Sequence, residues 1–167
     1  ARNAVRYLDG TEFAFEKISA QISLANSMSD RGRIEGDLET LEQVIVLYRS
    51  ARDSLLALNE HNELLCHVHN GLGSSLLRVE EFGENLNLAS LEEARRSFGE
   101  SIEISERFGD VEVWGGGNFN LGNVVLRLAH FRKENEEVHL LARLRAISCF
   151  QNAIEAYSEA SFPNQFA

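Results

Sequence analysis

Apolar residues recur at intervals of three and four along most of this chain. In residues 61–82 this spacing places Leu65, Val68, Leu72, Leu76 and Val79 on one helical face. Residues 88–108 repeat the pattern with Leu88, Leu91, Ala94, Phe98, Ile102 and Ser105. The stretch GENLN between them supplies glycine and asparagine, which end helices and form turns. Because no segment alternates with a period of two, the pattern predicts α-helices and no sheet.

The pattern repeats after about 50 residues. Leu72-Gly73 aligns with Leu121-Gly122 at a shift of 49, and the second helical segments align at a shift of 52, Phe98 with Phe150. A weaker unit lies upstream, where Ser23 takes the place of Gly73. Near the C-terminus, Phe166 aligns with Trp114 and is expected to begin a fourth, truncated unit.

Each unit contains two helical segments and is predicted to form one antiparallel pair of helices. A lone pair cannot bury its apolar face, so the pairs are expected to stack on one another. The whole chain, 1–167, is predicted to be one domain with helix pairs at 11–60, 61–110 and 111–160, followed by the start of a fourth unit at 161–167. The predicted fold class is all-α, an α-solenoid of about three stacked helix hairpins. A generic helical bundle is the alternative.

Two glycines lie within the predicted helices, although glycine costs about 1 kcal/mol relative to alanine in a helix interior. We expect Gly73 and Gly122 to let the first helix of a pair approach the second, opposite the small Ala94 and Ala146. The phenylalanine that follows each alanine is expected to fill the space one turn away. Leucine at 122 should therefore overpack this interface and destabilise the protein by about 1–3 kcal/mol.

The order of these residues resembles the tetratricopeptide repeat. In the last full unit the matching residues are Trp114, Leu121, Gly122, Ala146, Phe150 and Ala153. The likeness covers 11–167, most clearly 61–167, and is closest to the extended variants with long helices. The chain departs from the family in its period, which is about 50 residues instead of 34, in its single proline, Pro163, and in Ser23. The resemblance implies a non-catalytic scaffold for protein–protein interaction.

In such stacks the first helices line the concave surface, so the resemblance also implies a binding groove. Carried over by position, its residues are His67, Asn70, Ser74 and Arg78 in the second unit, and Phe119, Asn120, Asn123 and Arg127, with Gly116, in the third. The first unit gives Lys17, Ala20, Gln21, Leu24 and Met28. These asparagines can bond a peptide backbone and the arginines can bind carboxylates. Arg78 and Arg127 are 49 residues apart and should stack as a small basic strip.

The charge balance narrows the class of partner. The formal net charge is −10, which opposes binding to nucleic acids and to anionic membrane surfaces. No uninterrupted apolar run approaches the 18 residues of a membrane-spanning helix. Cys66 and Cys149 are far apart and form no CxxC pair, so we expect two buried thiols in a reducing compartment, the cytoplasm. We therefore expect a protein or peptide partner, no nucleic acid, no membrane, and a possible homo-oligomer.

The glycine-rich segment WGGGNFNLGN at 114–123 does not match a nucleotide-binding loop. Gly117 and Gly122 have the spacing of a P-loop, but Asn123 stands where lysine is required. We expect instead a helix start softened by three glycines.

The segment HNELLCHVH at 61–69 is not expected to bind a metal. His67 and His69 point about 200° apart on a helix, so they cannot share an ion. Cys66 could pair with His69 or Asn62, which provides at most two ligands, and no second pair follows in sequence. No histidine is fixed near either cysteine as a catalytic base, so the sequence predicts no enzyme, no metal and no cofactor.

The leading hypothesis is a scaffold that binds a peptide or partner domain in its concave groove, as a segment of a larger multidomain protein. The alternative is a structural or regulatory arm, or a homo-oligomerisation module, that serves a catalytic domain outside this segment.

Overall fold

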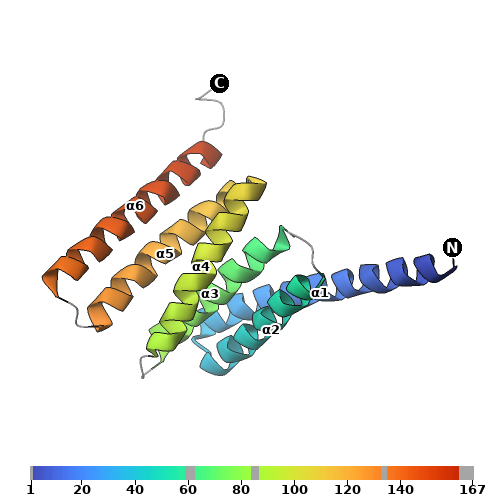
Figure 1. The fold of residues 1–167 in the computed structure, drawn as a ribbon. Coiled ribbons are helices and arrows are strands. Elements are labelled where there is room, and N and C mark those ends of the chain that lie inside the picture. Colours follow the sequence, from blue (N-terminus) through green and yellow to red (C-terminus); the bar gives the residue numbers. More distant parts are fainter. Residues whose placement is uncertain (1, 59–62, 84–86, 133–134, 162–167) are drawn as a thin grey trace.

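Six α-helices make up the fold. The computed structural model describes residues 2–58, 63–83, 87–132 and 135–161, with side chains from residue 13 to residue 158 of these ranges. The helices are α1 (Arg2–Glu35), α2 (Leu38–Ala57), α3 (Leu64–Phe82), α4 (Leu88–Phe108), α5 (Val111–Phe131) and α6 (Glu136–Ser161). The described residues contain no strand. Consecutive helices run antiparallel as three hairpins (Figure 1), which confirms the predicted stack of helix hairpins.

The hairpins follow the predicted repeat, except that α1 begins at Arg2 rather than near residue 11. Its N-terminal half extends past the end of α2 (Figure 1). The expected fourth unit, with Phe166, lies outside the residues that the structure describes.

The first helices of the hairpins form the tighter layer of the stack. The backbones of α1 and α3, and those of α3 and α5, approach within 8 Å, whereas no approach as close joins α2 to α4 or α4 to α6 among the described residues. A stack whose one layer is closer together than the other curves toward the closer layer. We therefore call α1, α3 and α5 the inner layer, and α2, α4 and α6 the outer layer.

The short turns between helices are fixed by capping residues. Asp37 begins α2, Asn87 begins α4 and Asp110 begins α5, and each accepts a hydrogen bond from a backbone N–H of the first helical turn. Gly109 ends α4 with a φ of 75°, a conformation that glycine adopts without strain. Adjacent Gly109 and Asp110 thus turn the chain from α4 directly into α5.

Positions 50 residues apart in α2 and α4 are buried alike. Val44, Tyr48 and Ala51 of α2 align with Ala94, Phe98 and Ser101 of α4, and all six are buried. Most of the remaining core residues are apolar residues of the inner layer, including Ile18, Ile22, Val68, Leu72, Leu121, Val124 and Leu128. The outer layer adds Ile45, Leu55, Leu91 and Cys149.

The two helical glycines pack against aromatic rings. A Cβ on Gly73 would lie 2.9 Å from Phe98 Cε1, and one on Gly122 would lie 2.6 Å from Phe150 Cε1. The sequence prediction placed Ala94 and Ala146 opposite these glycines. The nearest atoms belong instead to the rings, so each glycine provides a notch for the phenylalanine of its own hairpin.

The first hairpin packs differently because it has no such notch. Ser23, at the position of Gly73, is exposed, and its hydroxyl bonds to the carbonyl of Ser19. The ring of Tyr48 lies instead against Gly71 of the next hairpin, where a Cβ would meet it at 2.4 Å. The Tyr48 hydroxyl donates a hydrogen bond of 2.5 Å to Asn26 Oδ1 in α1. Tyr48 therefore joins the first hairpin to the second.

The three consecutive glycines of α5 are a packing feature rather than a softened helix start. The helix is continuous from Val111, with Asp110 as its cap. A Cβ on Gly115 would lie 2.7 Å from Ala156 of α6, and one on Gly117 would lie 2.9 Å from Ile102 of α4. Two of the three glycines thus let α5 pack closely between both neighbours.

Candidate functional site

The predicted groove residues of the second and third units all lie in the inner layer, on α3 and α5. His67 and Phe119 are exposed, and the other six are half-buried: Asn70, Ser74, Arg78, Asn120, Asn123 and Arg127. They form a surface of mixed polar and aromatic character across two adjacent hairpins.

Arg78 and Arg127 lie together at one end of this surface. Arg78 Nη1 is 2.5 Å from Glu81 Oε2, and Arg127 Nη2 is 3.1 Å from Glu81 Oε1. Two guanidinium groups from successive hairpins thus share one carboxylate, which leaves a local excess of positive charge. Glu81 was not among the residues predicted from the sequence, although its position three residues after Arg78 is a standard signal for a helical ion pair.

The middle of the surface contains amide and hydroxyl groups. Asn120 Nδ2 lies 3.5 Å from Ser74 Oγ and connects α5 to α3. Asn70 Oδ1 is buried and has no hydrogen-bond donor in the structure. A buried oxygen without a donor costs about 1–3 kcal/mol, so this amide gains from any rearrangement that gives it one.

An exposed aromatic ring completes the surface. Phe119 is 50% exposed, and its ring centroid lies 5.8 Å from that of Phe150 in a tilted arrangement. Since Phe150 also covers Gly122, the ring of Phe119 is held at the edge of the third hairpin.

The first hairpin contributes fewer of its predicted residues. Lys17, Ala20 and Leu24 are exposed, but Gln21 and Met28 serve the packing of the hairpin. Gln21 Nε2 donates to the carbonyl of Leu47 at 3.1 Å, and Met28 packs against the core. In the third hairpin, Gly116 lies near the hydroxyl of Tyr157.

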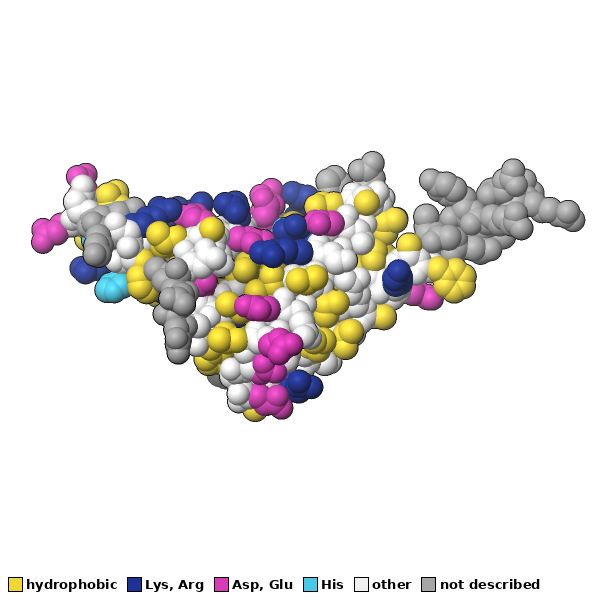
Figure 2. Space-filling view, turned by 90° about the horizontal axis from the view of Figure 1, so that it is seen from below, with side chains coloured by type: hydrophobic (Ala, Val, Ile, Leu, Met, Phe, Trp, Pro, Cys, Tyr) yellow, Lys and Arg dark blue, Asp and Glu magenta, His cyan; other side chains and the backbone are white. Residues whose placement is uncertain are grey.

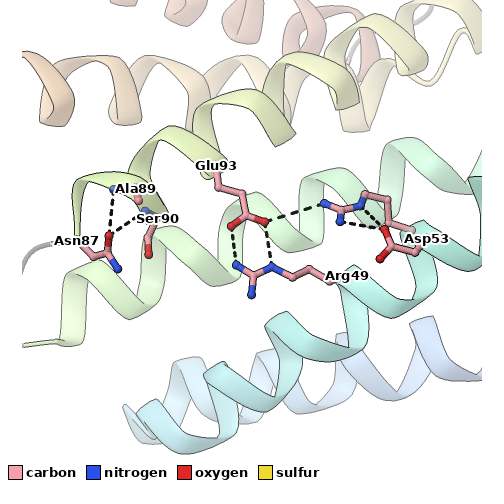
Figure 3. A network of polar contacts seen from close by, with 7 residues as sticks. Arg49, Asp53, Asn87, Ala89, Ser90 and Glu93 are labelled. Carbon is pink, nitrogen blue, oxygen red and sulfur yellow. Dashed lines mark hydrogen bonds and ion pairs between the residues drawn. The ribbon is translucent and has the colours of Figure 1, made fainter.

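The outer layer has a polar network that connects the first two hairpins. Arg49 Nε and Nη2 bond to the two oxygens of Glu93 at 3.0 and 2.5 Å, and Arg52 lies 4.0 Å from the same carboxylate (Figure 3). The hydrogen bonds from Arg49 hold the pKa of Glu93 below its usual value, and the same contact raises the pKa of Arg49. Asn87 caps α4 nearby (Figure 3). This forked ion pair holds α2 to α4.

A further cluster lies where the α4–α5 turn passes the first turn of α3. His67 Nε2 is 3.2 Å from Asp110 Oδ2, and the thiol of Cys66 lies beside them. The sequence predicted only His69 or Asn62 as a possible partner of Cys66, and Asp110, which belongs to the next hairpin, was not predicted. His69 is half-buried, and burial lowers its pKa to about 4. His61 and Asn62 lie outside the described residues.

On the face seen in Figure 2, acidic and basic side chains are interspersed with apolar ones. No helix in the described part of the chain combines the length and apolar character needed to cross a membrane.

The comparisons with known proteins assign no family. No family model and no curated protein matches the chain. Two solved structures are similar to it, one titled DHF58 filament, with a TM-score of 0.43, and one titled DHF119 filament, with a TM-score of 0.39. Both have 19% sequence identity, and the matches cover 92% and 91% of this chain and 76% of each of those chains.

Proposed function

We propose that this chain is a non-catalytic scaffold of the tetratricopeptide type that binds a peptide or partner domain on the inner layer. The observation that carries the proposal is the sharing of Glu81 by Arg78 and Arg127. A protein with a formal net charge of −10 here places two forked cations from successive hairpins around one carboxylate. Such a pair suits a carboxylate of an acidic peptide.

The neighbouring groups suit the rest of a peptide. Rotation of the Asn70 amide toward the surface would let its oxygen accept a hydrogen bond from a peptide N–H. Ser74 and Asn120 bridge the two helices beside it, and Phe119 offers an apolar contact. An extended acidic segment could therefore contact the two guanidinium groups, the amide and hydroxyl groups in the middle of the surface, and the ring of Phe119. Under this proposal the chain functions in the cytoplasm, as a segment of a larger protein.

The test is a change of charge on the inner layer. The Arg78→Ala/Arg127→Ala variant should lose at least tenfold in affinity for acidic peptides selected on the wild-type protein from a peptide array. The matched control is Arg96→Ala/Arg107→Ala, which removes two exposed arginines of the outer layer. Equal affinity of both variants for the selected peptides, with unchanged circular dichroism, would refute the inner-layer site.

A second candidate function, self-association, is supported by the outer face of α6. Leu140, Leu144, Ile147 and Ile154 recur at intervals of four, three and seven and are 55, 54, 51 and 65% exposed. The opposite face of α6, with Ala146, Cys149, Ala153 and Ala156, packs on α5 and is buried. This helix is therefore apolar on both sides, which is unusual for an exposed helix.

The repeat alignment relates the exposed apolar face of α6 to a face of α4. At the shift of 52, Leu144 and Ile154 correspond to Glu92 and Ile102 of α4. Those residues face α5: Glu92 pairs with Arg132, and Ile102 meets Gly117. The exposed face of α6 therefore corresponds to the face of α4 that packs on α5 of the next hairpin. Under this candidate, wild-type protein should show concentration-dependent sedimentation, and Leu144→Lys/Ile154→Lys should sediment as a monomer at all concentrations.

A further inference from the structure

Three side chains with different donor atoms meet at the junction of the second and third hairpins. Cys66 and His67 lie in the first turn of α3, and Asp110 lies in the turn that enters α5. The cysteine sulfur, one imidazole nitrogen and one carboxylate oxygen all lie within 4.8 Å of one another. Among them, His67 Nε2 and Asp110 Oδ2 are 3.2 Å apart. Nearest-neighbour ligand atoms around a tetrahedral ion are separated by distances of this order.

The backbone around the cluster is fixed on both sides. Asp110 Oδ1 accepts the Val113 N–H at 3.0 Å, so the carboxylate is oriented with its second oxygen toward His67. The Asp110 N–H itself bonds to the carbonyl of Ser105 at 2.9 Å. On α3, the carbonyl of Cys66 accepts a hydrogen bond of 2.8 Å from the buried Ser101 hydroxyl. A carboxylate with its other oxygen bonded is the arrangement that orients metal ligands in proteins.

The charges of the cluster favour a cation between its members. A cysteine that coordinates a metal ion is deprotonated, so the bound Cys66 sulfur and the Asp110 carboxylate would each carry a negative charge. A divalent ion would neutralise both groups and would accept the imidazole nitrogen as a third donor. Sulfur, nitrogen and oxygen donors together select zinc, or cobalt as its spectroscopic substitute, rather than magnesium or calcium, which prefer oxygen alone.

We propose that Cys66, His67 and Asp110 form a Zn²⁺ site with three protein ligands and a fourth position open to water. The ion would bind α3 to the α4–α5 turn and so connect the second hairpin to the third. This inference depends on the cluster alone and is independent of the peptide site, although His67 belongs to both surfaces.

The test is a Co²⁺ titration of untagged protein that has been freed of metal with a chelator. We expect binding of one ion per chain, with a near-ultraviolet thiolate-to-cobalt band and the visible bands of a tetrahedral complex, both abolished when Zn²⁺ is added. Cys66→Ser should remove the thiolate band. His67→Gln and Asp110→Asn should each lower the affinity at least tenfold.

His67→Gln and Asp110→Asn are chosen to preserve the fold. His67 is exposed, and asparagine caps a helix as well as aspartate does. Cys149→Ser and His130→Gln are the controls, and both should retain wild-type binding. Zn²⁺ should also raise the melting temperature of the wild type, and at the same concentration it should raise that of Asp110→Asn less. Absence of 1:1 binding to the wild type, or loss of the thiolate band in Cys149→Ser rather than in Cys66→Ser, would overturn the proposal.

Discussion

The phenyl ring of Phe98 occupies the space that a side chain on Gly73 would need. A Cβ on Gly73 would lie 2.9 Å from Cε1 and Cζ of that ring, and Phe98 is fully buried. The glycine in α3 and the phenylalanine in α4 therefore depend on each other for the close packing of the second hairpin.

The first prediction is that Gly73→Ala destabilises the protein although alanine is the better helix former. Because the Phe98 ring is fully buried, it cannot turn out into solvent, so overpacking should lower the free energy of unfolding by about 1–3 kcal/mol. Urea denaturation followed by circular dichroism measures the change. Gly99→Ala is the matched control, because a Cβ on this exposed glycine of α4 meets no atom within 4 Å. It should stabilise the protein by about 0.5–1 kcal/mol. Equal effects of the two substitutions would contradict the packing argument.

The second prediction concerns the corresponding pair in the third hairpin. Phe150 is half-buried, so its ring can move away from a methyl group on Gly122. Gly122→Ala should therefore cost less than Gly73→Ala, although its Cβ would lie closer to the facing ring, at 2.6 Å. Gly122→Leu exceeds the space that such a movement provides and should cost about 1–3 kcal/mol. Thermal unfolding of Gly73→Ala, Gly122→Ala and Gly122→Leu would check both expectations. A loss for Gly122→Ala as large as that for Gly73→Ala would refute the first, and an unchanged melting temperature for Gly122→Leu would refute the second.

The pairs of glycine and phenylalanine show how far the sequence predicts this fold. Helical periodicity and the 50-residue repeat were sufficient for the hairpins, because both arise from local spacing and from the same packing in successive units. The atom opposite each glycine was not predictable from spacing, since it depends on which rotamer the aromatic ring adopts. Tyr48 illustrates this, because it aligns with Phe98 but packs on Gly71 of the next hairpin.

The candidate site was predictable only where it follows the repeat. Arg78 and Arg127 occupy equivalent positions, so their approach in space follows from the stack. Glu81 and Asp110 were missed for different reasons. Glu81 lies one helical turn from Arg78 and was detectable as an ion pair within α3. Asp110 lies in the α4–α5 turn and contacts His67 of α3, where the second and third hairpins meet. Contacts between units at such turns have no periodic signal.

The third prediction is a pH dependence of stability from the Arg49–Glu93 pair. Since Arg49 lowers the pKa of Glu93 in the folded protein, the stabilisation is present above the pKa of the unfolded chain, about 4.3, and is lost as the pH falls through the folded value. At pH 7, Glu93→Gln should lower the free energy of unfolding by about 1 kcal/mol, because the pair is partly exposed.

This difference between the wild type and Glu93→Gln should shrink as the pH is lowered from 5 toward 3. Urea denaturation of both proteins at several pH values gives the comparison. Glu103→Gln, which removes an exposed carboxylate paired with Arg107 in α4, is the control and should change stability little at any pH. A Glu93→Gln effect that is constant across this range would show that the ion pair does not stabilise the fold.

The fourth prediction is that removing the carboxylate between the two inner-layer arginines strengthens binding of acidic peptides. In the free protein, Glu81 bonds to Arg78 and Arg127 at 2.5 and 3.1 Å and competes with any bound carboxylate. Glu81→Gln releases both guanidinium groups for the ligand. Since the Glu81 carboxylate lies near the surface, the loss of its ion pairs should cost less than about 1 kcal/mol of stability. The affinity for a selected acidic peptide should rise about threefold to tenfold, measured by fluorescence anisotropy.

The rise should be largest at low ionic strength, because salt screens interactions between partly exposed charges over about 10 Å at 0.1 M. Glu100→Gln makes the same change of net charge on the exposed surface of α4 and is the control. It should leave the affinity near the wild-type value. If Glu81→Gln binds the peptide no better than Glu100→Gln at low salt, Arg78 and Arg127 do not contact the ligand. Their pairing with Glu81 would then serve only to hold the second and third hairpins together.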